Sequence, residues 1–234
     1  MYWWNILEEL FGRDPDPLVK HNHEIFRNFN YNFDIDSYDF VVFDTEFTGL
    51  DPSRDEIVSI AAVKIESMRI ALDRSFHSLM GVKKKIMGEG TFVHKITPEL
   101  IRNAPDPKNV LHHFFEYCGN SVLVGHLPNL DFSFLDRQCS KIMGGVIHNP
   151  CLDSMALAKA LWKKSERNKN IALPKIDSFN LLEVSRSLGI PLFPSHNALG
   201  DALQTACLFL YLVHRLKCLG YRSLKDFYKL GGVR

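Results

Sequence analysis

Two acidic side chains, Asp44 and Glu46, interrupt the apolar stretch FVVFDTEF at residues 40–47. The surrounding residues are typical of a buried β-strand, and residues two apart on a strand point to the same face, so the two carboxylates should lie close together. Like charges held close together in a buried position raise each other's pKa unless a cation lies between them. The stretch therefore predicts a site that binds a cation, although an Asp-x-Glu pair alone is a weak signal.

A third acid, Asp131, lies in GHLPNLDFSFL at 125–135, where a short apolar strand at 121–127 gives way to an amphipathic helix. In open α/β sheets, ligands gather at such transitions from strand to helix. An aspartate near a helix N-terminus is also an ordinary capping residue. From these residues alone, a ligand-binding role and a capping role both remain open.

The segment PSHNALGDAL at 194–203 adds His196 and Asp201 at the start of a long predicted helix. Side chains five residues apart on a helix point about 140° away from each other, so the two converge only if His196 lies in the preceding loop. Small side chains around Asp201 would let this helix approach a strand closely; they belong to Ala198, Gly200 and Ala202.

Four carboxylates and a histidine could thus form one site; they are Asp44, Glu46, Asp131, Asp201 and His196. Four hard oxygen ligands without a cysteine favour Mg²⁺ or Mn²⁺ over zinc. Two such ions ~3.5–4 Å apart can stabilise both the attacking and the leaving oxygen of an in-line phosphoryl displacement. The residues therefore indicate phosphoryl chemistry that depends on divalent cations.

The elements that would position these residues form a regular pattern from Phe40 onward. The periodicity predicts strands at 40–47, 56–66, 75–80 and 121–127. It predicts helices at 97–105, 107–119, 129–145, 153–164, 178–189 and 198–217, the first capped by Thr97 with Pro98 at its first position. Three early strands followed by alternating strands and helices predict an α/β domain, in which helices flank a mixed β-sheet.

Residues 1–37 differ in composition from the main domain, which is expected to span 38–234. An aromatic-rich amphipathic stretch at 2–10 predicts a helix, and the polar segment at 19–32 is interpreted as a connector. The helix of this N-terminal extension either packs on the outside of the main domain or binds another protein through residues 1–38. Both interpretations remain open.

The bulk composition excludes several classes of protein. With 234 residues and 46% hydrophobic residues, the chain can bury a sizeable core, and its net charge of +1 neither requires nor excludes a nucleic-acid partner. Five scattered cysteines without a C-x-x-C pair indicate reduced thiols rather than disulfides or a zinc site. Because no signal peptide or apolar run long enough for a membrane span is evident, we expect no membrane association and a cytoplasmic protein.

Three segments of the chain resemble, in order, the three motifs of the DEDDh 3′–5′ exonucleases. They are FDTEFTGL at 43–50, the segment that contains Asp131, and the H-x-A-x-x-D pattern at 196–201. This DnaQ-like family includes polymerase proofreading subunits and several RNases. The resemblance extends from about Tyr38 to Lys217 and implies a ribonuclease-H-like fold. The second motif departs from the family's usual H-N-x-x-F-D, because Leu127 and Leu130 replace the asparagine and the phenylalanine.

The resemblance also implies a role for each site residue. Asp44 would bridge two Mg²⁺ or Mn²⁺ ions, Glu46 and Asp201 would complete one metal site, and Asp131 would support the other. His196 would act as the general base, for which a pKa near neutral is suited. A further implied contact holds the terminal nucleotide of the substrate through Thr48, Gly49 and Leu50.

These features predict an exonuclease acting at the 3′ end of single-stranded nucleic acid, with DNA favoured over RNA. An exoribonuclease of the same family and an inactive module that binds nucleic acid or protein remain alternatives. A phosphatase of the haloacid-dehalogenase type also begins with a pair of acids on a strand, but it would require Asp-x-Asp where this chain has Glu46. The 33 residues after Asp201 leave no long tail of the kind that proofreading subunits use to reach a polymerase. We therefore expect a free-standing exonuclease or one that binds a partner through residues 1–38, and association with a polymerase is left open.

Overall fold

The computed structural model describes residues 14–82, 96–168, 172–194 and 197–233. Its strands are β1 (Phe40–Phe47), β2 (Ile57–Glu66), β3 (Arg69–Leu79), β4 (Val122–Gly125) and β5 (Cys151–Asp153). Its α-helices are α2 (Pro17–Phe26), α4 (Pro98–Arg102), α5 (Pro107–Cys118), α6 (Asn129–Met143), α7 (Ser154–Arg167), α8 (Leu181–Ser187), α9 (Ala198–Cys218) and α10 (Leu224–Gly231). A single 3₁₀ turn, η1 (Ile35–Ser37), precedes β1.

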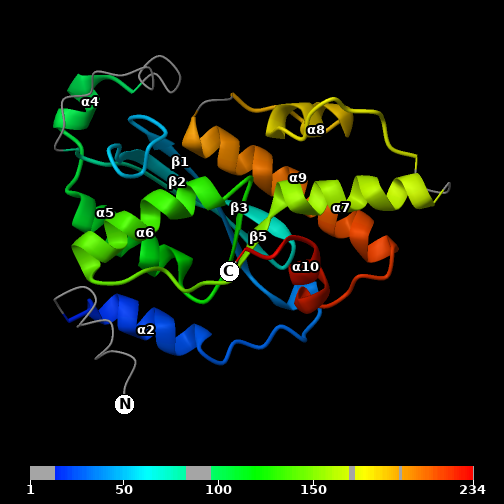
Figure 1. Cartoon of the computed structure of the whole chain (residues 1–234), viewed down its shortest axis with the longest axis horizontal. Helices are drawn as coiled ribbons and strands as arrows, with labels where there is room; N and C mark the ends of the chain where they lie inside the picture. Colours follow the sequence, from blue (N-terminus) through cyan, green and yellow to red (C-terminus); the bar gives the residue numbers. More distant parts are fainter. Residues whose placement is uncertain (1–13, 83–95, 169–171, 195–196, 234) are drawn as a thin grey trace.

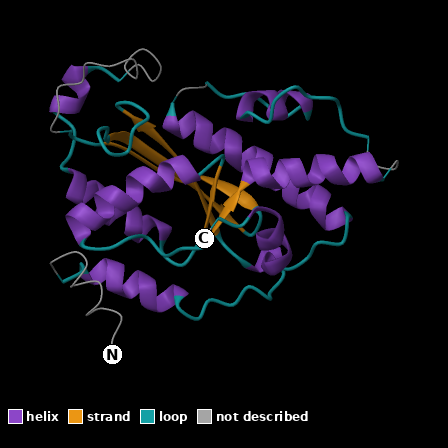
Figure 2. Ribbon diagram, viewed as in Figure 1, coloured by secondary structure: helices purple, strands orange, loops and turns teal. Residues whose placement is uncertain are grey.

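Within these residues the strands form one mixed sheet in the order β3-β2-β1-β4-β5. The first three strands along the chain pair antiparallel, whereas β4 and β5 run parallel to β1. Helices lie on both faces of the sheet, with α7 and α9 on one and α5 and α6 on the other (Figures 1 and 2). The predicted α/β class with a mixed, helix-flanked sheet is confirmed.

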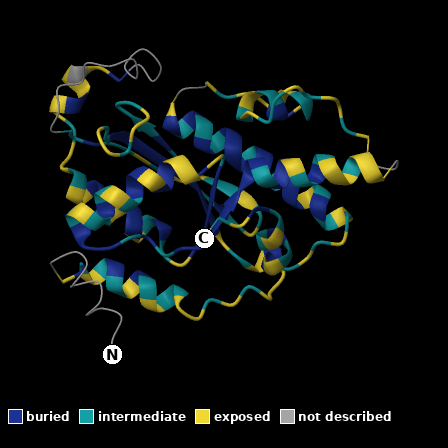
Figure 3. Cartoon of the chain, in the orientation of Figure 1, coloured by how far each residue is buried: buried dark blue, intermediate teal, exposed yellow. Residues whose placement is uncertain are grey.

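Alternation along β1 divides the core into two layers. Phe40 points toward α9, where its ring lies 5.0 Å from that of Phe209, whereas Phe43 points toward α6, where its ring lies 5.5 Å from that of Phe132. Burial of each such ring contributes roughly 1.5–3 kcal/mol, and the central strands are the most buried part of the chain (Figure 3). The same alternation places Asp44 in the row of Phe40, on the α9 face.

The segment predicted as a connector at 19–32 is instead largely helical, because α2 covers Pro17–Phe26. Asp16 caps this helix by accepting a hydrogen bond from the backbone N–H of Leu18 at 3.1 Å. Val19 is fully buried against the layer of α5 and α6, and the buried Asn22 amide donates to Asn149 Oδ1 at 2.6 Å. The polar residues of this segment suggested a connector, because hydrogen-bond partners such as Asn149 are distant in sequence and could not be anticipated.

Most predicted elements are present with shifted ends, and some short elements were not predicted. The strand predicted at 75–80 begins earlier, at Arg69, while β5 and α10 were missed. The helix predicted within residues 2–10 lies outside the described residues. None of the helices in the described part of the chain combines the length and the apolar character needed to cross a membrane.

Candidate active site

The two acids of β1 lie where this strand extends beyond β4. The parallel pairing of β1 with β4 ends at Val42 and Val124, so Asp44 and Glu46 lie at the carboxyl end of the parallel strands, where α/β sheets bind ligands. Opposite them on β2 are the small residues Ala61 and Ser59. Because directly paired residues share a face, these small side chains leave space above the acids.

Asp201 reaches the same place from the first turns of α9. Asn197 caps this helix, because its side chain accepts hydrogen bonds from the backbone N–H groups of Leu199 at 3.1 Å and Gly200 at 3.2 Å. A Cβ atom on Gly200 would lie 2.2 Å from the carbonyl oxygen of Pro194, so only glycine permits this entry into the helix. The small residue at position 200 therefore serves a close approach to the preceding loop, whereas the sequence analysis predicted an approach to a strand.

The carboxylates of Asp44, Glu46 and Asp201 converge, with one oxygen of each within 4.8 Å of the others. All three side chains are half-buried. Among the described residues, neither Asp44 nor Glu46 takes part in an ion pair with a lysine or arginine. The arrangement is therefore a cluster of oxygen donors in which no lysine or arginine of the described part of the chain neutralises Asp44 or Glu46.

Asp131 lies beside this cluster, in the first turn of α6. It is only 8% exposed, and its Oδ1 accepts a hydrogen bond from the hydroxyl group of Thr45. It is not the helix cap, since Pro128 occupies the N-cap position without a side-chain hydrogen bond. Thr45 alternates with its neighbours Asp44 and Glu46, so the strand presents acids on one face and an anchor for Asp131 on the other.

In the metal-free protein the acids hold protons unusually tightly. Burial raises the pKa of Asp44 well above its ordinary value, and the carboxylates of Asp131, Asp201 and Glu46 raise it further. Burial, followed by the charges of Asp201 and Asp131, raises the pKa of Glu46 to about 7. Burial also raises the pKa of Asp131 to about 7, despite the opposing hydrogen bond from Thr45. A divalent cation would replace these protons and remove the repulsion.

Of the remaining predicted site residues, three are described by the structure and one, a histidine, is not. Thr48, Gly49 and Leu50 form the start of the turn between β1 and β2, with Leu50 76% exposed. The predicted general base, His196, lies outside the described residues, so its role stays a prediction. The structure thus brings the carboxylates together and shows the conformation of the turn, while the role of His196 is outside what it describes.

Sequence reasoning missed Gln204, which holds the chain just before residues 195–196. Its side chain is 3% exposed; Oε1 accepts from the N–H of Phe193 at 3.0 Å, and Nε2 donates to the carbonyl oxygen of Pro191 at 3.1 Å. A buried amide needs such partners. The available signal was a glutamine on an otherwise apolar stretch of helix, three residues after Asp201.

The sheet and the acid cluster together define an α/β protein of the ribonuclease-H-like exonuclease class. Residues 41–209 match the family model described as Exonuclease (RNase_T). The chain belongs to this exonuclease family, in its DnaQ-like branch. Membership excludes the phosphatase alternative, whose motifs belong to another fold family.

Named relatives agree with this assignment. The chain is 34% identical over 224 residues to a PolC-type DNA polymerase III of Thermotoga petrophila, a match that covers 96% of this chain but only 15% of the relative. It is 28% identical to the DNA polymerase III subunit epsilon of Aquifex aeolicus over 76% of this chain and 81% of the relative. The chain therefore spans a small part of the PolC-type relatives and most of the epsilon subunit.

Solved structures share the fold. Exonuclease X, in complex with 5′-overhanging duplex DNA, superimposes with a TM-score of 0.60 at 20% identity, covering 82% of this chain and 98% of that one. Exonuclease I of E. coli, in complex with a dT13 oligonucleotide, gives a TM-score of 0.64 at 16% identity, covering 79% and 43%. At these identities the likeness establishes the fold alone.

Proposed function

We propose that this chain is a metal-dependent 3′–5′ exonuclease that releases nucleoside 5′-monophosphates from single-stranded nucleic acid, with DNA preferred over RNA. The observation that carries the proposal is the convergence of the Asp44, Glu46 and Asp201 carboxylates within 4.8 Å. The names of the relatives, which are DNA polymerase III chains, support a DNA substrate.

The donor set fits hard divalent cations. It consists of oxygen atoms, and at least two of its acids have a raised pKa in the absence of metal. In the proposed site Asp44 would help to hold two Mg²⁺ or Mn²⁺ ions, Glu46 and Asp201 would complete the binding of one ion, and Asp131 would support the other. When bound, the ions would stabilise charge on the phosphodiester and lower the pKa of the attacking water.

The other residues of the proposed site handle protons and the substrate. His196 accepts the proton of the attacking water as its oxygen bonds to phosphorus. The bond that breaks joins phosphorus to O3′ of the preceding nucleotide, so the released nucleotide keeps the phosphate on its 5′ oxygen. Thr48, Gly49 and Leu50 receive the terminal nucleotide, with the exposed Leu50 against its base.

The extension at residues 1–37 adds a separate proposal. Helix α2 is docked on the body through Val19 and Asn22, whereas the first 13 residues lie outside the described part. We assign the exonuclease domain to 38–234 and a partner-binding role, with a polymerase chain as the candidate, to the start of the chain. Pull-downs with the full chain and with residues 14–234 would test it; equal capture by both would exclude the first 13 residues.

The function is tested with oligonucleotides labelled at either end. In Mg²⁺ or Mn²⁺, a 5′-labelled single-stranded DNA should shorten progressively, and a 3′-labelled one should release labelled mononucleotide at once. Excess chelator should stop both reactions, and matched RNA should be degraded more slowly. Full activity in chelator, or initial release of the 5′ label, would overturn the proposal, while faster RNA degradation would favour the exoribonuclease.

A further inference from the structure

A single carboxylate organises the turn between β1 and β2. Asp55 Oδ1 accepts a hydrogen bond from the Thr48 hydroxyl at 3.1 Å, and Asp55 Oδ2 accepts one from the backbone N–H of Asp51 at 3.0 Å. The backbone N–H of Asp55 in turn donates to the carbonyl oxygen of Asp51 at 2.7 Å. The Asp55 side chain therefore spans the turn from its first residue to its middle.

The Thr48 hydroxyl is committed to the same turn. It accepts a hydrogen bond from the backbone N–H of Glu56 at 3.1 Å while it donates to Asp55. The backbone N–H of Thr48 also donates to the carbonyl oxygen of Glu56 at 3.0 Å. Between these contacts Gly49 is half-buried, while the side chain of Leu50 is presented to solvent and is 76% exposed.

Gly49 lies directly over the Asp55 carboxylate. A Cβ atom at this position would come within 2.4 Å of Asp55 Oδ2, so the glycine and the aspartate are mutually fitted. A side chain on residue 49 would displace the carboxylate, and an absent carboxylate would leave Gly49 free to sample many backbone conformations. The conformation of Gly49 therefore depends on Asp55.

Packing alone does not fix this turn. A cavity of about 310 Å³ lies against it, lined among others by Asp55, Arg137 and Gln138. The turn touches helix α6 through the Arg137 guanidinium, which donates to the carbonyl oxygen of Pro52. With open space on one side, hydrogen bonds rather than close-packed side chains hold the turn in place.

We propose that Asp55 is a positioning residue for substrate binding, which holds Gly49 and Leu50 in the conformation that receives the terminal nucleotide. The inference rests on the proposed function, because it assigns a role to the turn that this function uses. Asp55 itself does not touch the reacting atoms. Without it, the turn would have to be ordered anew each time a strand binds, which weakens binding while the metal site stays intact.

Two substrates separate positioning from chemistry. A single-stranded deoxyoligonucleotide engages both the turn and the metal site, whereas bis(p-nitrophenyl) phosphate, a diester without base or sugar, engages the metal site alone. For Asp55→Ala we expect KM for the oligonucleotide to rise about tenfold with kcat little changed, since an interaction made equally in ground and transition state is lost. Hydrolysis of bis(p-nitrophenyl) phosphate should match the wild type.

Conservative and matched variants complete the test. Asp55→Asn should keep KM within about twofold, because its Oδ1 can accept from Asp51 and its Nδ2 can donate to Thr48. Asp73→Ala removes an exposed aspartate of β3 and should leave both substrates unaffected. If thermal melting shows that Asp55→Ala does not fold, Arg137→Ala loosens the same turn at Pro52 and should raise KM without changing its salt dependence.

The outcomes distinguish this role from the proposed function. An active wild type together with an unchanged KM in Asp55→Ala would overturn the role of Asp55 alone. Equal losses on both substrates would also overturn it, because the effect would then lie at the metal site. A wild-type protein that degrades neither substrate would overturn the proposed function and the inference with it.

Discussion

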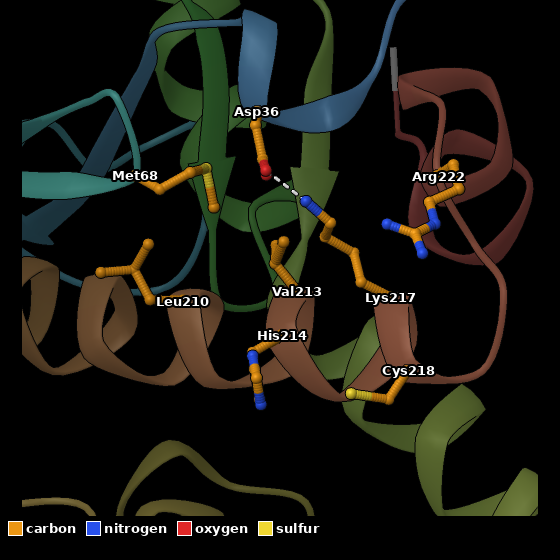
Figure 4. Close-up of a pocket in the computed structure, with 8 residues that line it drawn as sticks. All are labelled: Asp36, Met68, Leu210, Val213, His214, Lys217, Cys218 and Arg222. Atoms are coloured by element: carbon orange, nitrogen blue, oxygen red, sulfur yellow. Dashed lines mark hydrogen bonds and ion pairs between the residues drawn. The ribbon is translucent and has the colours of Figure 1, made fainter.

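The two ends of β1 and α9 carry two groups of acids that the protein treats in opposite ways. At the amino end of β1, Lys217 near the end of α9 forms ion pairs with Asp34, at 3.7 Å, and with Asp36 (Figure 4). At the carboxyl end, the start of α9 brings a further acid, Asp201, to Asp44. The same pair of elements thus neutralises one group and concentrates charge in the other.

The neutralised group shows what a structural acid requires. Lys217 lines an open pocket of about 450 Å³ together with Met68 and Arg222, and its side chain remains 21% exposed (Figure 4). Partly exposed ion pairs of this kind need little desolvation and contribute little to stability. Desolvated acids brought together are costly, and a fold retains such a cost where function needs it. The contrast supports the proposal that the cluster at Asp44 holds cations.

The largest effect is expected from removing one charge of the cluster. Asp44→Asn should lower the rate of strand degradation by about 10³-fold or more, because a metal ligand supplies several kcal/mol of transition-state stabilisation. Asp36→Asn makes the same change at the other end of β1 and should alter the rate by less than about twofold. Single-turnover assays on labelled DNA compare the two variants; equal rates would erase the distinction between the two ends.

The next largest effect is expected from the general base. His196→Ala should slow the reaction by ~10²–10⁴-fold while metal affinity stays near that of the wild type, because the acids remain. The wild-type rate should fall as pH drops below the imidazole pKa, near ~6.5 if unperturbed. The pH–rate profiles of both proteins at saturating metal provide the measurement. The same acid limb in the variant would show that His196 is not the base.

Stability should depend on pH at the cluster. Burial and neighbouring charges raise the pKa of Glu46 from 4.5 to about 7, and burial raises the pKa of Asp131 from 3.8 to about 7. The folded state therefore binds protons more tightly than the unfolded state. Stability of the metal-free protein should therefore fall as pH rises from about 4 to about 7 and remain low above that, with Tm dropping about 2–4 °C per kcal/mol lost.

Divalent cations should reverse this loss, because they bind the deprotonated cluster of the folded state. Differential scanning calorimetry in chelator and in Mg²⁺ at several pH values provides the measurement. Asp44→Asn should show a smaller decline than the wild type, whereas Asp36→Asn should follow the wild type. A metal-free Tm that increases steadily across this pH range would contradict the assigned pKa directions.

The smallest effect is expected at the neutralised group. Lys217→Ala removes both ion pairs, but its partners Asp34 and Asp36 have side chains 44% and 45% exposed. Partly exposed pairs contribute up to ~1 kcal/mol each, so loss of the two should lower Tm by at most about 4–8 °C, and activity should not change. Thermal melts at low and high salt measure this; a loss of activity would show that this end takes part in the reaction.

The residues with local signals could be predicted from the sequence. The β1 acids stood out because charged side chains interrupt an apolar strand, and α9 because it is long and begins with a capping asparagine. Helix α10 also has a local signal, because Ser223 and Asp226 form a capping box, although the sequence analysis did not predict this helix.

The rest depends on contacts distant in sequence. The polar segment around Asn22 becomes helical because its amide is satisfied by Asn149, and no local pattern indicates that partner. Thr45 anchors Asp131 across 86 residues. The capping interpretation is excluded only once the fold shows Pro128 at the N-cap of α6, and the ligand role of Asp131 stays a prediction. The division between residues 37 and 38, and the role of His196, stay predictions.

The central claim is the proposal that the acid cluster at Asp44 binds divalent cations. Titration of the metal-free protein with Mn²⁺, with free ion followed by electron paramagnetic resonance, tests it most directly. The wild type and Asp36→Asn should each bind a pair of ions, while Asp44→Asn should lose most of this binding. Absence of binding by the wild type, or equal binding by Asp44→Asn, would contradict the claim.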